Sequence, residues 1–482
     1  MNDVFARILP IVGNHLFNKN IAILGDAYLL MDYLCGCGIT KYAVTEDNRL
    51  AVERAANRLS EKLGLRIEIS SGNIDFLVAA GRRDVLQTAN KFCLTNTCEG
   101  LFFSQLENGA GLIVTLPTTT ADLIVDVNIR GTLLLDNLLT VAAALVKGRL
   151  LNSTPLARSD INSFYNGRPL LIGHPSWPWA VEEVSSQNLS LVAKGQLKSS
   201  TLNGKRILIV GLGSLGSIVA EKLATLGADL VLFDGESVDI TNPIRQLYSV
   251  KQVGKPKVEA CAELLGASKC LTFMKNLDET NLDELDRLGH LDFAVLSTGT
   301  NHDRAVSAQL RSIKVPHLAI SCYARARYFE AIIVTEEGPC FSCIRGHIHR
   351  GPTPELTPEQ RRMYAAPHEL QAEPATIVET ARAAIAAALI TTSYLNPEVW
   401  LCRIIAEERT LLLGANYAEI NADGLYPYGI DKVGAARVYG PDEIAGRGDY
   451  VECAECKRKL EVALKLKEAF DLSSLQIPFD QN

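Results

Sequence analysis

The sequence lacks the long apolar runs, basic stretches and low-complexity tracts that mark several classes of protein. No apolar stretch reaches the roughly 20 residues that a membrane-spanning helix needs. The first residues include an early acid and no small-residue cleavage site, so we expect no secretion signal. These absences predict a soluble protein of the cytoplasm.

The chain also has no surplus of positive charge. Its 482 residues include 48 Lys and Arg against 55 Asp and Glu, which gives a formal net charge of −7. Because binding to nucleic acid phosphates needs a basic face, we expect no nucleic acid partner. In a reducing cytoplasm the 12 cysteines should stay free, which favours metal binding or catalysis for closely spaced pairs.

The sequence does contain an alternation of predicted strands and helices, and this pattern occurs twice. A chain of this length needs more than one core, and alternating strands and helices favour a mostly parallel sheet covered on both faces. We therefore predict an α/β fold used twice. Residues 1–150 form the first domain, residues 151–200 a connecting segment rich in Ser, Pro, Asn and Gly, and residues 201–482 the second domain.

A glycine turn opens the second domain. The apolar run "RILIV" breaks at Gly211, Gly213 and Gly216 and resumes with helical spacing, and the next predicted strand ends at Asp234. Such a turn lets a phosphate approach the backbone N–H groups of a helix N-terminus, and a carboxylate at that distance binds a ribose hydroxyl. The alternatives are a dinucleotide dehydrogenase and a turn kept only for packing.

Polar and cationic residues follow directly after Asp234. Within sixteen residues the chain places Asn242, Arg245, Gln246, Lys255 and Lys257. Arg and Lys together neutralise a triphosphate, and phosphoryl-type transfers depend mainly on positioning and electrostatic stabilisation. A dehydrogenase does not need these charges there. The alternative is a solvated basic loop.

This order of motifs resembles the ThiF/HesA/MoeB and ubiquitin-activating adenylyltransferase superfamily, most specifically over residues 201–260. The resemblance implies two Rossmann-like ThiF-type domains. It implies that Asp234 holds the ribose, that Asn242, Arg245 and Lys257 hold the phosphates, and that Gln246 positions the reacting groups. The nucleotide site implied in this way also includes Glu236, Lys255 and Thr298.

The implied reaction joins the C-terminal carboxylate of a ubiquitin-like protein to the AMP part of ATP, with Mg²⁺ as a cofactor. Thioester transfer to a ubiquitin-conjugating-type enzyme is a step that the resemblance leaves open, and so is a homodimer. One alternative is an adenylating enzyme of peptide or sulfur-carrier biosynthesis. Another is a nucleotide-binding scaffold with impaired catalysis.

The first half is similar to the inactive adenylation domain of ubiquitin-activating enzymes. It keeps one glycine, Gly25, where the second half has three, and the side chains of Ala27 and Leu30 would obstruct a phosphate. In the family an Arg ahead of the first strand of one domain reaches the nucleotide of the other. Arg7 lies where such a residue would start, and an ordinary surface arginine is the alternative.

The sequence departs from the family at the magnesium position. The family's D-x-T-D stretch reads Leu296-Ser297-Thr298-Gly299 here, so a glycine stands where an Asp is expected. Since Mg²⁺ prefers oxygen ligands, either another acid such as Asp303 or Glu236 reaches the metal, or ATP carries it, or adenylation is impaired.

Two Cys-x-x-Cys pairs lie about 110 residues apart, Cys340 with Cys343 and Cys453 with Cys456. Four thiolates suffice for a closed tetrahedral Zn²⁺ site, which would be structural and would tie the C-terminal segment to the second domain. The family has such pairs at comparable points. Unrelated thiols or a redox pair are the alternatives.

Residues 345–375 resemble the family's crossover loop, which passes over the bound carboxyl tail. The nucleophilic Cys of many members is missing, because none lies between Cys343 and Cys402. Transfer directly from the adenylate, a thioester elsewhere, or a Cys replaced by alanine at Ala365 or Ala366 would each explain this. Cys322 is a weak candidate, since a buried Cys is usually a small hydrophobe.

Overall fold

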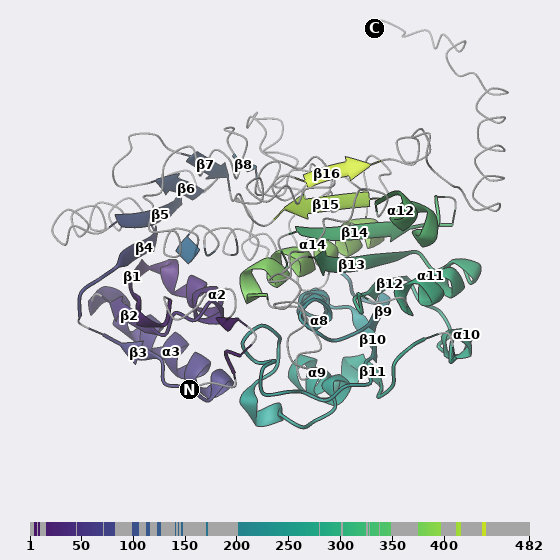
Figure 1. Ribbon diagram of the computed structural model, residues 1–482, viewed down its shortest axis with the longest axis horizontal. Coiled ribbons are helices and arrows are strands. Elements are labelled where there is room, and N and C mark those ends of the chain that lie inside the picture. Colours follow the sequence, from purple (N-terminus) through teal and green to yellow (C-terminus); the bar gives the residue numbers. More distant parts are fainter. Residues whose placement is uncertain are drawn as a thin grey trace, which may run out of the picture.

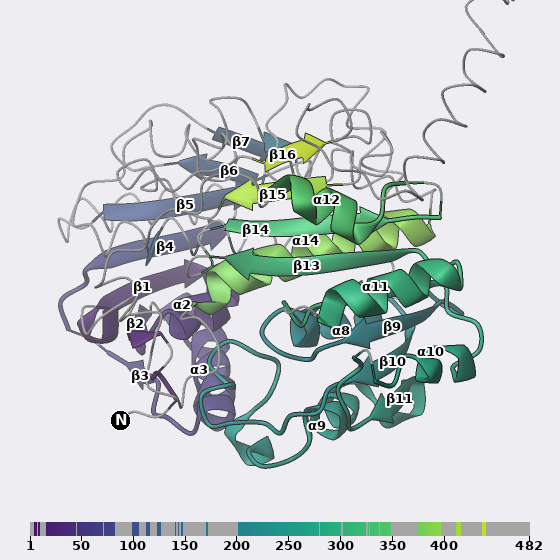
Figure 2. The same ribbon diagram turned by 45° about the vertical axis from the view of Figure 1, so that its right-hand side comes forward.

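The structure is a computed structural model. It describes residues 4–81 except 7, 10–15, 45 and 71, and residues 201–348 except 279, 300, 301, 324, 325, 327 and 337, together with 375–396 and the shorter pieces 99–105, 112–115, 123–126, 140, 143, 146, 147, 170–171, 411–415 and 436–439. Within these ranges no helix combines the length and the hydropathy that crossing a membrane requires. Figures 1 and 2 show the arrangement of the described elements.

Two eight-stranded sheets are formed by the described residues. The first has the strands β1 (Asn20–Gly25), β2 (Lys41–Val44), β3 (Glu68–Ile69), β4 (Phe76–Gly81), β5 (Glu99–Gln105), β6 (Leu112–Thr115), β7 (Leu123–Asp126) and β8 (Leu170–Leu171). The second has β9 (Arg206–Val210), β10 (Asp229–Phe233), β11 (Cys270–Phe273), β12 (Phe293–Leu296), β13 (His317–Tyr323), β14 (Tyr328–Val334), β15 (Leu411–Ala415) and β16 (Ala436–Tyr439).

Helices connect and cover these strands. The α-helices are α2 (Met31–Gly36), α3 (Arg49–Leu63), α8 (Gly216–Thr225), α9 (Lys257–Leu265), α10 (Asp283–Arg287), α11 (His302–Ser312), α12 (Phe341–Ile348) and α14 (Ile377–Leu395). The 3-10 helices are η1 (Leu16–Asn18), η2 (Asp26–Leu30), η3 (Glu46–Asn48), η4 (Val250–Gln252) and η5 (Ala267–Lys269).

Both sheets have the same strand order, β3-β2-β1-β4-β5-β6-β7-β8 and β11-β10-β9-β12-β13-β14-β15-β16. In each, the first five strands pair in parallel and the next two pairings are antiparallel. This confirms the prediction of an α/β fold with mostly parallel sheets. The sequence did not predict β15 and β16, and β8 lies within the predicted connecting segment.

Strand β9 shows how the apolar pattern builds two layers on the second sheet. Ile207 and Ile209 point into the core cluster that contains the buried residues of α8 and α14. Leu208 and Val210 point to the opposite face, into the cluster with α10, α11 and α12. A run that is apolar at every position is therefore buried on both faces, as expected for a central parallel strand.

Helix α14 lies at the boundary between the two halves. In both views it runs alongside β13 of the second sheet and packs against α8, with its N-terminal end next to α2 (Figures 1 and 2). Its residues from Ile377 to Ser393 are all buried, and one continuous core cluster includes side chains of α2, α3, α8 and α14. The two halves thus share a single hydrophobic core.

Buried polar contacts fix the start of α14 to the first half. Thr376 and Glu379 form a capping box, in which the Thr376 N–H donates to a Glu379 carboxylate oxygen at 3.0 Å. Lys147, 1% exposed, forms an ion pair with Glu379 and donates to the Thr376 hydroxyl oxygen at 3.3 Å. The Cys37 thiol lies 3.7 Å from the same hydroxyl.

Candidate nucleotide site

The glycine turn follows β9 and contacts the end of β12. Gly211 has a φ of 86°, in the left-handed region, and its N–H donates to the Phe233 carbonyl at 2.8 Å. A Cβ at Gly211 would lie 3.1 Å from the Ser297 carbonyl oxygen, and one at Gly216 would overlap the Gly211 carbonyl. Both glycines are therefore required by the close packing of strand, turn and helix.

Gly213 has a different environment. A Cβ placed there would meet no atom within 4 Å in the part of the chain that the structure describes, so its outer side is open with respect to these residues. At the N-terminus of α8, Leu215 is the N-cap and makes no side-chain capping hydrogen bond within the described part of the chain. Open backbone in front of helical N–H groups is the arrangement that accepts a phosphate.

The strand order places this turn at the switch point of the sheet. From β9 the chain continues to β10 on one side, whereas β12 pairs with β9 on the other side. The turn after β9 lies beside Ser297, whose hydroxyl donates to the Gly211 carbonyl at 2.8 Å. In open α/β sheets, ligands bind at such a point beyond the carboxyl ends of the strands.

Asp234 lies next to the turn, directly after β10, and is 7% exposed. Its carboxylate accepts the Leu212 N–H at 2.6 Å and the Glu236 N–H at 2.8 Å. Burial raises the pKa of Asp234, while Lys257 and the two N–H donors act in the opposite direction. Since a carboxylate can accept about four hydrogen bonds, capacity remains for ribose hydroxyls.

Lys257 is the first residue of α9 and is 5% exposed. Its ammonium forms an ion pair with Glu236, whose side chain is 58% exposed. The positive charge of Lys257 opposes the rise in the pKa of Asp234. Because the Glu236 N–H also donates to the Asp234 carboxylate, the buried Lys257 lies close to Asp234.

Asn242, Arg245 and Gln246 are at most 3% exposed. The Asn242 carbonyl accepts the N–H groups of Arg245 at 3.0 Å and Gln246 at 2.9 Å, so the three residues form one tight turn. The Gln246 side-chain oxygen is buried, and no described protein atom donates to it. The burial of these three residues argues against a solvated loop at this part of the segment, because burying such groups is costly unless they have partners.

Two hydrogen bonds join this segment to the glycine turn. The Tyr248 hydroxyl donates to the Leu212 carbonyl at 2.9 Å, and the Leu247 N–H donates to the Ser217 hydroxyl oxygen at 3.4 Å. Sequence reasoning did not select Tyr248 or Ser217. Their positions in the sequence could have suggested a role in the site, because Tyr248 lies two residues after Gln246 and Ser217 lies in the first turn of the helix after the glycines.

The turn after β12 involves Thr298, Gly299 and Asp303. The Thr298 hydroxyl and the Gly299 N–H donate to the Asp303 carboxylate at 2.7 and 3.0 Å. Asp303 is 1% exposed, and both of its oxygens are engaged in closing this turn. Gly299 has a φ of 66°, and a Cβ there would meet no atom of the described residues within 4 Å.

Other predicted residues lie apart from this cluster or outside the described residues. Lys255 forms an ion pair with Glu263 at 2.8 Å, with both side chains about half exposed. Cys322 is half-buried in β13. Arg7 and residues 349–374 of the predicted crossover loop lie outside the described residues.

The first Cys pair lies at the start of α12. Cys340 precedes the helix and its carbonyl accepts the Ile344 N–H, while Cys343 lies in the first turn and is buried. No group of three or more candidate metal ligands occurs in the part of the chain that the structure describes. Cys453 and Cys456 lie outside it, so only two of the four predicted thiolates are placed.

The corresponding turn of the first half is filled by its own residues. After β1 the chain enters η2 at once, and Ala27 and Leu30 are fully buried in the core. By the sheet register Glu46 takes the place that Asp234 has after β10, and it is exposed, whereas Asn48 at the end of η3 donates its amide to the Ile23 carbonyl at 2.8 Å.

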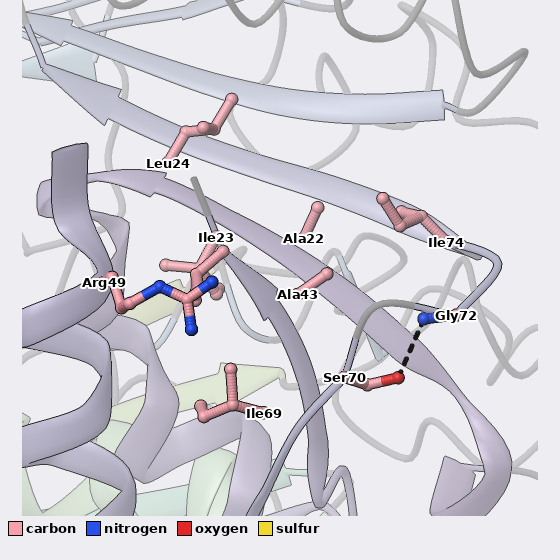
Figure 3. A pocket seen from close by; sticks show the side chains of 10 residues that line it. Ala22, Ile23, Leu24, Ala43, Arg49, Ile69, Ser70, Gly72 and Ile74 are labelled. Carbon is pink, nitrogen blue, oxygen red and sulfur yellow. Dashed lines mark hydrogen bonds between the residues drawn. The ribbon is translucent and has the colours of Figure 1, made fainter. Parts of the chain in front are cut away.

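The first half contains a cavity of about 380 Å³ on its own sheet (Figure 3). The sheet register aligns its Ala22 and Ala43 with Leu208 and Val231 of the second sheet. In the second half the chain between β11 and β12 contains α10, whereas only 70–75 link β3 to β4. Smaller side chains and a shorter connection account for the cavity, which does not involve the glycine turn.

A Rossmann-type sheet with a glycine turn at its switch point, a buried carboxylate and buried cations defines a nucleotide-binding α/β domain. Comparison of the sequence with known protein families identifies the particular family. Residues 185–394 match the ThiF family, and the chain therefore contains a ThiF family domain. The resemblance stated from the motifs is confirmed.

Curated relatives match over a short stretch. The chain is 42% identical over 65 residues to ubiquitin-like modifier-activating enzyme 5 of Caenorhabditis briggsae, covering 13% of this chain and 15% of the relative. It is 44% identical over 66 residues to molybdopterin-synthase adenylyltransferase of Escherichia coli (strain K12), covering 13% and 26%. It is 40% identical over 70 residues to tRNA threonylcarbamoyladenosine dehydratase of Bacillus subtilis (strain 168), covering 14% and 28%.

The chain thus matches between 15% and 28% of the length of these relatives. A solved structure of E. coli MccB with AMPCPP and MccA gives a loose likeness, with a TM-score of 0.38, 14% identity, and coverage of 71% of this chain and 95% of that chain.

Proposed function

We propose that this protein adenylates the C-terminal carboxylate of a ubiquitin-like protein with ATP, releasing pyrophosphate. The observation that carries the proposal is the buried cationic segment held against the glycine turn. Arg245 and Lys257 are nearly excluded from solvent, and Tyr248 and Leu247 bond the segment to Leu212 and Ser217. A site that only bound a dinucleotide would not need these cations.

The residues present fit ATP. The open side of Gly213 and the N-terminus of α8 would accept phosphate, and Asp234 would accept the ribose hydroxyls. The buried oxygen of Gln246 is an acceptor available to a donor on the bound substrates. Arg245 and Lys257 would balance the triphosphate charge.

The reaction follows from this placement. A carboxylate oxygen of the protein substrate attacks the α-phosphorus of ATP, and the bond from that phosphorus to the bridging oxygen of the β-phosphate breaks. The leaving pyrophosphate gains negative charge, which the Arg245 guanidinium and Lys257 ammonium stabilise in a site of low dielectric. Asn242 helps to fix the turn that carries Arg245.

A Mg²⁺ ion bound with ATP would neutralise further phosphate charge. Asp303 is unsuited to hold it, because its carboxylate already closes the turn after β12. Glu236 suits it better, since its side chain is more than half exposed beside Lys257. We propose Glu236 as the protein ligand in place of the family's Asp.

The remaining parts of the assignment are also proposals. Residues 1–150 are an inactive adenylation domain, residues 151–200 a connection, and residues 201–482 the active domain in a cytoplasmic enzyme. Cys340, Cys343, Cys453 and Cys456 hold a structural Zn²⁺, so metal analysis should find about one zinc per chain. If metal analysis finds no zinc, the proposed four-cysteine site is wrong. If the substrate is a ubiquitin-like protein, we also expect a homodimer and onward transfer of that protein to a conjugating enzyme.

The second candidate is adenylation of a sulfur carrier or a peptide. It is supported by the match to molybdopterin-synthase adenylyltransferase, which is as high in identity as the match to the ubiquitin-like modifier-activating enzyme. The chemistry would be the same and only the acyl partner would differ. Pyrophosphate exchange stimulated by one class of candidate carrier and not by the other decides between them.

The main test is ATP–pyrophosphate exchange with added candidate carriers. The Arg245→Ala variant should lose about 100-fold or more of the activity, because it lacks the charge that stabilises the leaving group. Arg287→Ala is the matched control, since that exposed arginine of α10 pairs only with surface acids. Equal exchange in Arg245→Ala and the wild type would refute the assigned role.

A further inference from the structure

The first half contacts the cation-bearing segment of the second half directly. Gly36, the last residue of α2, lies against the backbone of Ile244, the residue before Arg245. A Cβ added to Gly36 would lie 3.1 Å from the Ile244 carbonyl oxygen and would overlap the Ile377 side chain of α14. Only a glycine lets α2, α14 and this segment meet so closely.

A second contact lies a few residues further along. Gly64 ends α3 with a φ of 63°, and a Cβ there would lie 3.2 Å from a methyl group of Val250. An exposed ion pair between Lys251 and Glu61 lies beside it. Exposed ion pairs contribute little to stability. We therefore attribute the attachment of this segment to the first half to the close contacts at the two glycines.

The two contacts bracket the functional residues. Ile244 precedes Arg245 and Gln246, and Val250 follows Tyr248, which bonds to the glycine turn. Ile244 and Tyr248 are buried in the core shared by the two halves. The backbone that carries Arg245 and Gln246 is therefore held from the first half on one side and from the glycine turn on the other.

We propose that the first half positions the phosphate-binding segment for ATP, and that Gly36 is the positioning residue through which it acts. The proposal rests on the proposed function for the identity of the ligand. It assigns the first half a task within the site that requires no nucleotide or catalytic group of its own. Gly36 fixes the Ile244 carbonyl, and this fixes the direction in which Arg245 leaves the backbone.

The test measures ATP binding by calorimetry and thermal unfolding on the full chain. Gly36→Ala should weaken ATP binding about tenfold, because a displacement of a few tenths of an ångström at Ile244 misplaces the charged groups. Gly72→Ala is the matched control. It lies in the same half, has its nearest neighbour atom 3.4 Å from the added Cβ, and should bind ATP like the wild type.

A rescue experiment separates positioning from a general loss of stability. Ile377→Ala removes the methyl group that the new Cβ would overlap and leaves the Ile244 carbonyl in place. In the Gly36→Ala/Ile377→Ala variant the melting temperature should rise from that of Gly36→Ala, while ATP binding stays weak. Recovery of ATP binding together with stability would overturn the proposal.

Val250→Ala gives an independent variant should Gly36→Ala fail to fold. It loosens the contact at Gly64 without introducing a clash, and ATP binding should weaken severalfold. Unchanged ATP affinity in Val250→Ala or in folded Gly36→Ala would refute the positioning role while leaving the adenylation proposal intact. A wild-type protein that binds no ATP would instead refute the proposed function itself.

Discussion

The Tyr248 hydroxyl donates a hydrogen bond of 2.9 Å to the Leu212 carbonyl, across 36 positions of the sequence. Tyr248 follows the turn that carries Arg245, and Leu212 lies inside the glycine turn. This bond therefore joins the two segments that form the candidate site. Both residues are fully buried, and burial raises the pKa of Tyr248 well above its ordinary value. The hydroxyl therefore stays protonated and serves as a donor.

Replacing Tyr248 by Phe should lower the free energy of unfolding by about 1–2 kcal/mol, because the buried Leu212 carbonyl loses its donor. It should also weaken ATP binding. Tyr42→Phe is a matched control, since the buried Tyr42 hydroxyl donates to the Ile39 carbonyl at 2.8 Å within the first half. Urea unfolding and calorimetry on both variants provide the comparison. Equal ATP affinities in the two would show that the Tyr248 bond does not support the site.

Lys255→Ala should change ATP–pyrophosphate exchange by less than about twofold, because its ammonium binds Glu263 at the surface. Lys257→Ala should reduce exchange about 100-fold. The resemblance puts both lysines in the site, whereas the structure pairs Lys255 with Glu263 and Lys257 with Glu236, whose N–H donates to Asp234. A large loss in Lys255→Ala would mean that this side chain leaves Glu263 when ATP binds.

Lys147→Met should destabilise the protein by about 3–5 kcal/mol, because the Glu379 carboxylate would stay buried without its cation. The same change should loosen the attachment of α14 to the first half. Lys251→Met is the matched control, with an exposed ion pair to Glu61 and an expected loss of under about 1 kcal/mol. Denaturant unfolding measures both. Similar losses in the two variants would contradict a buried, essential pair.

Stability should fall on acidification in part through His317. This residue is fully buried, its Nε2 lies 2.6 Å from the Ser307 hydroxyl, and its Nδ1 lies 2.9 Å from the Val315 carbonyl. Burial lowers the pKa of His317 from 6.5 to about 4; the Val315 carbonyl opposes this shift and Arg311 adds to it.

Below pH 6.5 the unfolded chain protonates this ring before the folded chain does. The contribution of His317 is therefore complete above pH 6.5 and is lost as the pH falls toward 4, by up to about 3 kcal/mol. Urea unfolding at pH 7 and pH 4.5 should show a smaller loss in His317→Gln than in the wild type. An identical loss would mean that other groups account for the pH dependence.

Much of the second domain could be predicted from local sequence. The apolar run of β9, the spacing of its glycines and the helical period that follows depend on backbone geometry and on the period of the apolar pattern, so they are visible in the sequence alone. The same reasoning found the α/β class and the ThiF family. Strands β15 and β16 were missed, because short antiparallel strands have a weak signal that depends on partners distant in sequence.

The sequence by itself determined the residue types near the nucleotide turn, because glycine spacing and charge are properties of the chain. Only the tertiary structure decided what each residue does with its neighbours. It directs Lys255 to Glu263 and engages Asp303 in a turn. It also brings Gly36 against Ile244, across 208 positions. Such contacts depend on how the two halves pack around α14, and no local pattern in the sequence encodes a distance between segments so far apart.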